Sequence, residues 1–171
     1  MKKLICLILA WMLSLSLCAC DAAEEILEMG KTLNTKTYTV DNLSIDLTRE
    51  FLRMDMLAQD FDFAVSDGDI TVFGESVDYA EYELFGISAW DYAAAFRESM
   101  TDNPVTEVTD LEGIPTLQYT ATDDDGEQLT YVVAVYEASD RFWILQFCFE
   151  TDDYDELYPL VKQYALSVKC N

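Results

Sequence analysis

Two neighbouring apolar runs dominate the hydrophobic pattern in the last third of the chain. Residues 129–137 and 142–149 are rich in β-branched and aromatic side chains, and the short polar segment 138–141 separates them. Such a pair predicts a β-hairpin. Both runs are apolar at nearly every position, whereas a strand with one solvated face alternates apolar and polar residues. We therefore expect a central hairpin covered on both faces of its sheet.

Shorter alternating runs upstream predict two more hairpins. Residues 38–40 and 43–47 flank an Asp-Asn turn pair. Residues 61–65 and 70–73 flank the four-residue segment Ser-Asp-Gly-Asp, which is a strong hairpin signal. The sheet should thus gain strands before its first helix.

The region before the central hairpin predicts the rest of the sheet. Residues 105–111 have the composition of a strand, and residues 113–115, Gly-Ile-Pro, that of a turn. Residues 116–122 should pair with 129–137 across the acidic turn 123–126. With the second strand of the central hairpin, these strands form an antiparallel meander.

Two segments have the spacing of amphipathic helices. Ser88 is placed to cap the first helix, and Asp91 three residues later can complete a capping box. Its apolar positions are Ala89, Ala93, Phe96 and Met100. The second helix should begin near Asp155 or Glu156, because Pro159 is tolerable only in a first turn. Its apolar face consists of Leu157, Leu160, Val161, Tyr164 and Val168.

Residues 1–20 have the pattern of an export signal. Lys2 and Lys3 precede an apolar stretch, 4–17, that is shorter than the roughly 20 residues of a membrane span. The stretch ends in Leu-Cys-Ala-Cys, which resembles the lipobox of bacterial lipoproteins. That resemblance implies cleavage before Cys20 and lipidation of Cys20. The alternative is an ordinary cleaved signal peptide.

The remainder divides into two parts by composition. Residues 21–37 are polar and bury too little to fold alone, so we expect a flexible tether. Residues 38–171 show no repeat, linker or break in composition, which predicts a single α+β domain.

The order of the predicted elements resembles the PsbP/DcrB-like fold over residues 38–169. The resemblance is carried by the helix start at Ser88, the turn at Gly113, the hairpin at Gly126, the strand at Phe142-Trp143 and the closing amphipathic helix. It implies an α/β/α sandwich, in which helices flank an antiparallel β-sheet. The group includes bacterial membrane-anchored lipoproteins and photosynthetic accessory subunits, and is generally non-enzymatic. No set of functional residues is carried over from it, because fold alone does not imply function.

Charge and composition exclude several classes of function. The 171 residues carry a formal charge of -23 and contain no histidine. The missing histidine removes the usual general base and the commonest zinc ligand. The acidic surface argues against binding nucleic acid or anionic lipid headgroups. There is also no glycine-rich phosphate loop, no Gly-x-Ser-x-Gly and no Cys-x-x-Cys motif.

Two acidic clusters are candidates for a metal site or for acid–base chemistry. In an EF-hand register Gly126 would be position six, and positions one and twelve would be Ala121 and Val132, which are not ligands. Residues 123–126 are therefore interpreted as a solvated turn, with a weak divalent-ion site as the alternative. The acidic residues at 152–156 are explained by the dipole at the start of the second helix. We expect no metal and no cofactor.

One aromatic group remains as a candidate binding surface. Tyr79, Tyr82, Phe85 and Trp90 surround the entry to the first helix. Core packing is the ordinary role of such side chains, and a groove for a partner or ligand is the alternative. We also expect Cys148 and Cys170 to remain unbridged, because the intervening helix carries the chain away from the strand.

These observations predict an exported lipoprotein, anchored by lipid at the outer face of the cytoplasmic membrane, with a non-catalytic binding or accessory role. Its partner would be a protein or a small molecule, and not a nucleic acid. Two alternatives stay open. One is a hydrolase of the cell envelope that uses carboxylates alone, and the other is a structural subunit of an envelope complex.

Overall fold

The computed structural model describes residues 34–57, 60–101, 104–123 and 125–171. Residues 35–171 make up one of the two units into which the chain divides. The predicted signal segment with Cys20, and residues 21–33 of the predicted tether, lie outside the described residues. The first strand begins at Thr35, whereas the sequence pattern places the start of the domain at Tyr38.

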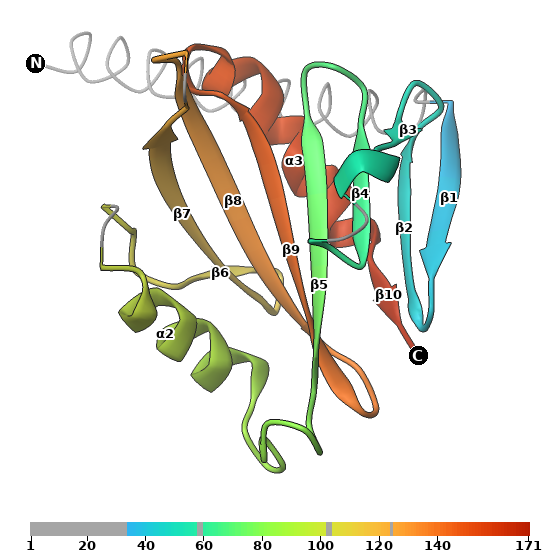
Figure 1. Ribbon diagram of the computed structural model, residues 1–171, viewed down its shortest axis with the longest axis vertical. Coiled ribbons are helices and arrows are strands. Elements are labelled where there is room, and N and C mark those ends of the chain that lie inside the picture. The colour runs from blue at the N-terminus through green and yellow to red at the C-terminus, as the bar shows by residue number, and fades with distance from the viewer. Residues whose placement is uncertain (1–33, 58–59, 102–103, 124) are drawn as a thin grey trace, which may run out of the picture. The chain divides into compact units, whose positions relative to one another are not determined.

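The described elements form two antiparallel sheets and two α-helices (Figure 1). The larger sheet has the order β3-β4-β5-β9-β8-β7-β6, and its strands are β3 (Leu52–Arg53), β4 (Phe63–Ser66), β5 (Thr71–Asp78), β6 (Thr109–Leu111), β7 (Ile114–Thr122), β8 (Gln128–Glu137) and β9 (Arg141–Glu150). The smaller sheet has the order β1-β2-β10, with β1 (Thr35–Val40), β2 (Leu43–Thr48) and β10 (Lys169–Cys170). The helices are α2 (Ala89–Ser99) and α3 (Tyr154–Ser167), with short 3₁₀ helices at Asp55–Leu57 and Thr151–Asp153. The predicted α+β class is confirmed.

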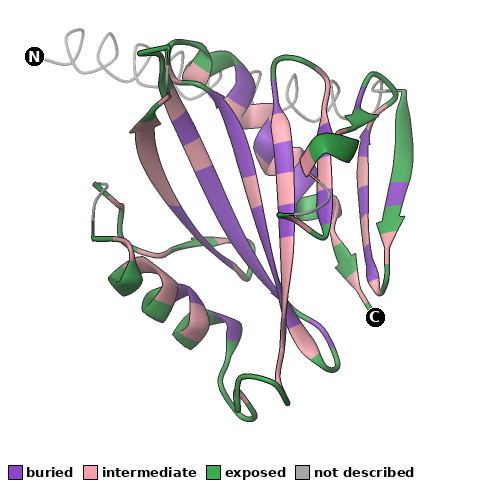
Figure 2. Cartoon of the chain, viewed as in Figure 1, coloured by how far each residue is buried: buried purple, intermediate pink, exposed green. Residues whose placement is uncertain are grey.

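The hairpin of β8 and β9 lies in the middle of the seven-stranded sheet, as its unbroken apolar runs predict. Trp143 and Leu145 belong to a cluster on one face, and Phe142 and Ile144 belong to a cluster on the other. Figure 2 shows both strands buried over most of their length. Because both faces of the hairpin are covered, the side chains that point to either face of the sheet are apolar.

The face that contains Trp143 is covered by α3 and the β1–β2 hairpin. Tyr164 and Val161 of α3 are buried in the same cluster as Trp143. The inward positions of β2 are Leu43, Ile45 and Leu47, all at most 1% exposed. The indole N–H of Trp143 donates a hydrogen bond of 2.8 Å to Oδ1 of Asn42, which connects this hairpin to the large sheet. The sequence pattern does not reveal that β2 also pairs with β10, which makes a separate small sheet.

The opposite face is covered in part by α2. Ser88 caps this helix through a hydrogen bond from the Asp91 N–H, and the carboxylate of Asp91 accepts one from the Ser88 N–H, so the predicted capping box is confirmed. Hydrogen bonds from Ser88 lower the pKa of Asp91. Ala89 and Ala93 are buried against the sheet. Small side chains at these positions let the helix approach the strands closely.

Two predicted boundaries are wrong around β6 and β7. The strand expected over 105–111 is confined to Thr109–Leu111, while Val105 makes only an isolated bridge to Tyr119. The turn expected over 113–115 consists instead of Glu112 and Gly113, with φ values of 52° and 95°. A two-residue turn with positive φ at both positions matches the twist of a hairpin. Ile114 and Pro115 therefore already belong to β7.

The start of α3 also differs from the prediction. The helix begins at Tyr154, one residue before the earliest expected position, so Pro159 lies in the second turn. The proline costs one intrahelical hydrogen bond there. The 3₁₀ helix Thr151–Asp153 runs directly from β9 into α3 and sets where the helix begins.

Cys148 and Cys170 both have free thiols in the structure. Cys148 pairs in register with Tyr131 and Thr71, on the face that carries α2, whereas Cys170 packs against the cluster of the α3 face. The sheet therefore separates the two thiols. In the described part of the chain, no helix is both long enough and apolar enough to cross a membrane.

Candidate functional site

The segment between β5 and α2 presents large apolar side chains to solvent. Its backbone is shaped by local turns, because Oδ1 of Asp78 accepts hydrogen bonds from the N–H groups of Ala80 and Glu81. Glu83 and Gly86 adopt positive φ values of 56° and 81°. These turns bury few side chains of the segment and leave most of them outside the core.

Tyr79 anchors this segment to the domain. Its hydroxyl donates a hydrogen bond of 3.0 Å to the carbonyl of Ala138, and its ring lies 4.8 Å from that of Phe142. Burial, followed by the nearby charges of Glu137 and Asp140, raises the pKa of Tyr79 to about 12. Tyr79 is therefore a half-buried structural contact, and the interpretation of this residue as packing is the better one.

The other aromatic side chains of the predicted surface are exposed. Tyr82 is 58% exposed, Phe85 73% and Trp90 41%, and Ile87 between them is 37% exposed. We call these four residues the aromatic ridge. The remaining exposed large hydrophobic residues of the described chain, Leu52, Met56 and Leu166, lie elsewhere in the sequence. Single exposed apolar residues are ordinary, whereas four of them lie here within nine positions of the chain, and groups of exposed apolar residues mark interaction sites.

A hollow of about 350 Å³ lies beside Trp90. Its lining comes from the start of α2, the β6–β7 turn, the end of β8 and the C-terminal segment, namely Ser88, Ala89, Trp90, Gly113, Ile114, Pro115, Val135, Tyr136, Glu137, Val168 and Cys170. Small-molecule pockets usually begin at about 300 Å³, so the hollow can accept a compact ligand or a large apolar side chain.

The hollow forms where the ladder between β7 and β8 stops. The last paired residues are Thr116 and Ala134. The next residue of β7 is Pro115, which has no N–H to continue the ladder. Val135, Tyr136 and Glu137 are paired on one side with β9 and border the hollow.

The polar side chains that line the hollow are those of Ser88, Tyr136, Glu137 and Cys170. Burial raises the pKa of the Cys170 thiol to about 11, so it is protonated at neutral pH and is a poor nucleophile. The Ser88 hydroxyl donates to Asp91 at 2.6 Å and is part of the helix cap. Glu137 is the one carboxylate among the lining residues.

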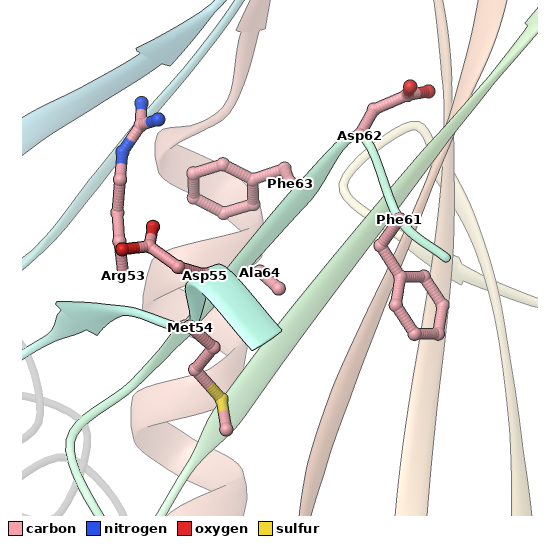
Figure 3. A pocket seen from close by; sticks show the side chains of 7 residues that line it. All are labelled: Arg53, Met54, Asp55, Phe61, Asp62, Phe63 and Ala64. Carbon is pink, nitrogen blue, oxygen red and sulfur yellow. The ribbon is translucent and has the colours of Figure 1, made fainter. Parts of the chain in front are cut away.

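A second, smaller hollow lies beside β4 (Figure 3). It has a volume of about 40 Å³ and is lined by Arg53, Met54, Asp55, Phe61, Asp62, Phe63 and Ala64. Figure 3 shows the side chains of Met54 and Phe61 directed away from the guanidinium of Arg53. This volume has room for a few water molecules and not for an organic ligand.

The acidic turn after β7 has a structural role. Oδ1 of Asp123 accepts hydrogen bonds from the N–H groups of Asp125 and Glu127 at 2.9 and 2.8 Å. Among the residues whose positions are described, no group of three or more acidic or cysteine side chains could hold a metal ion.

The sequence analysis named Tyr82, Phe85 and Trp90, which the structure leaves exposed, and did not name Ile87. It also missed the hollow, because its walls come from four separate parts of the chain. One local signal was available. Pro115 inside a strand predicts an interrupted ladder, and the hollow lies at that interruption.

Comparison with known proteins shows the fold alone. No protein-family model matches the chain, and no curated protein matches it. The structure is similar to cyanobacterial PsbP (CyanoP) from Synechocystis sp. PCC 6803, with a TM-score of 0.56 and 14% identity over 80% of this chain and 92% of that chain. A Bacteroides thetaiotaomicron crystal structure gives a TM-score of 0.51 and 8% identity over 81% of this chain and 49% of that one. The fold is thus PsbP-like, as the sequence resemblance implies.

Proposed function

We propose that this protein is an exported lipoprotein whose domain binds a partner protein without catalysing a reaction. Lipidated Cys20 would hold it at the outer face of the cytoplasmic membrane, and the partner would dock on the aromatic ridge. The observation that supports docking most strongly is the exposure of the ridge, with Tyr82 at 58% and Phe85 at 73%.

The ridge and the hollow together suit a protein partner. Tyrosine and tryptophan are enriched among the residues that contribute most to binding, because they bury large areas at a small cost in conformational entropy. The hollow beside Trp90 would receive one apolar side chain of the partner. The formal charge of -23 disfavours strongly anionic partners, so shape and apolar contact carry the recognition.

A structural subunit of an envelope complex is a second candidate, because a permanently covered ridge would explain the same exposure. The accessory protein and the structural subunit differ in how stably they stay bound to their partner. A subunit would remain bound in constant proportion through purification, whereas an accessory protein would exchange. The hydrolase alternative would show turnover in broad hydrolase screens, and we expect none.

A pull-down from native membranes tests the docking surface. The anchored wild type should retain a partner that the double variant Tyr82→Ala/Phe85→Ala loses. Met56→Ala is the matched control, because Met56 is 92% exposed and lies outside the ridge. A partner that is retained equally by all three proteins would contradict docking on the ridge.

A further inference from the structure

The helix α2 covers only one part of its face of the seven-stranded sheet. Residues in register across neighbouring strands share a face, and one such row consists of Tyr119, Tyr131, Cys148 and Thr71. The next row contains Leu117, Val133, Gln146 and Phe73. Leu117 and Val133 pack with α2, which fixes the side of the sheet. The aromatic members, Tyr119, Tyr131 and Phe73, are only half-buried, and Figure 2 shows β7 as mostly intermediate in burial.

Aromatic rings are organised on this open part of the sheet. The rings of Tyr119 and Tyr131 are stacked with centroids 4.6 Å apart and an interplanar angle of 1°. The hydroxyl of Tyr119 donates a hydrogen bond of 2.8 Å to Oε1 of Gln146. At the β4–β5 side, Phe61 lies 4.7 Å from Phe73. These contacts hold aromatic side chains together on this face of the sheet.

A carboxylate lies in the same region. Glu75 is paired in register with Ile144, and so faces the α2 side of the sheet. On that face of β9, Ile144 is flanked by Phe142, whose ring centroid lies 4.9 Å from that of Tyr92, and by Gln146, which accepts the hydrogen bond of Tyr119. The charge of Glu75 raises the pKa of Tyr92 after burial, and that of Tyr119 after burial and Cys148. Burial, followed by the charge of Asp62, raises the pKa of Glu75 itself.

No cation of the described chain neutralises Glu75. Among the hydrogen bonds and ion pairs between described residues, none involves its carboxylate, whereas Arg97 pairs with Glu107 and Arg141 with Asp140. Lys36 and Lys162 lie over the rings of Tyr38 and Tyr158. An unpaired carboxylate that is partly removed from water destabilises a fold, and such groups are concentrated at functional sites.

We propose that this open face binds an extended protein segment through a lysine side chain, with the lysine ammonium at Glu75 and its methylenes against Tyr92 and Tyr119. A carboxylate beside aromatic rings is the chemistry that recognises an ammonium, because the ring faces and the carboxylate both attract the positive charge. The row from Thr71 to Tyr119 crosses four neighbouring strands about 4.8 Å apart, so a segment longer than the lysine alone can lie across it. The site adjoins the aromatic ridge, because Tyr82 of the ridge also raises the pKa of Tyr92. Its test changes only residues outside the ridge.

The test uses a defined probe. The full-length protein, purified in neutral detergent, is titrated with the peptide acetyl-Val-Thr-Lys-Thr-Val-amide and followed by NMR. A second peptide carries Nε-acetyl-lysine, which removes the charge and keeps the shape. The lysine peptide should shift the ring signals of Tyr119 and Tyr131 and the amide signal of Glu75, and the acetylated peptide should bind about fivefold more weakly.

Variants distinguish binding at Glu75 from nonspecific attraction of the lysine peptide to an acidic protein. Glu75→Gln should weaken the lysine peptide about fivefold and leave the acetylated peptide unchanged. Glu156→Gln, which removes an exposed carboxylate from α3, should change neither affinity. Tyr119→Leu provides a second test of the ring contact and should weaken the lysine peptide. Equal affinity for both peptides, or an equal loss in Glu156→Gln, would overturn the proposal.

Discussion

Substitution of Gly74 by alanine should destabilise the domain, because the space for a Cβ is already filled. A Cβ at this position of β5 would lie 2.8 Å from Cδ2 of Leu145 and 3.1 Å from Cβ of Phe63. Both neighbours belong to the buried core, and Leu145 is fully buried. Overpacking of this kind costs about 1–3 kcal/mol. The lower backbone entropy of alanine in the unfolded chain offsets about 0.4–1 kcal/mol of it.

The net loss for Gly74→Ala should be about 1–2 kcal/mol, which corresponds to a melting temperature about 3–8 °C lower. The companion variant Leu145→Val removes the methyl group that the new Cβ would meet, at its own cost of about 0.5–1.5 kcal/mol. Thermal and urea unfolding of the two single variants and the double variant form a cycle. We expect the double variant to lose about 1 kcal/mol less stability than the sum of the losses in the two single variants. Additivity within about 0.5 kcal/mol would refute the reasoning.

Three further predictions concern the proposed sites. Tyr82→Ala should increase the dissociation rate from the partner about tenfold or more, with little change in association rate or salt dependence, in surface plasmon resonance; an affinity that collapses as salt is raised would show that charge drives recognition. Glu75→Gln should melt at a higher temperature than the wild type at pH 7. Because the pKa of Glu75 is raised on folding, the folded protein binds this proton more tightly than the unfolded chain does. The stability that Glu75 contributes is therefore present below its ordinary pKa of 4.5 and is lost as the pH rises through the folded pKa. The difference in melting temperature should therefore vanish below pH 4.5, and a difference that is constant with pH would exclude this origin. Cys20→Ser should leave the precursor unprocessed in intact-mass analysis, and a wild type that is cleaved but not acylated would contradict lipidation.

The parts of the fold that sequence reasoning predicted depend on local chemistry. The capping box of Ser88 and Asp91 requires only residues three positions apart. The β8–β9 hairpin follows from two adjacent apolar runs, and the absence of alternation in them correctly predicts that both faces are covered. In each case the residues that decide the structure are close in sequence.

The parts that were missed depend on contacts between distant segments. β10 comprises two residues and is held by pairing with β2, more than a hundred positions earlier. To predict where the β7–β8 ladder ends, the relative positions of Pro115 and Val135 must be known. To predict the hollow, the position of Cys170 at the end of the chain must be known as well. The open tyrosine face is likewise a property of register, because no local pattern shows that Tyr119 and Glu75 share one side of the sheet.

Site-specific photo-crosslinking in native membranes tests the docking surface most directly. A photoreactive phenylalanine analogue replaces Phe85 of the ridge in one protein and Met56, which is more exposed, in another. We expect Phe85 to crosslink to one defined protein, the additional change Tyr82→Ala to abolish this product, and Met56 to give none. Equal crosslinking of the same protein from Met56, or no product from Phe85, would contradict a binding domain that docks through its aromatic ridge.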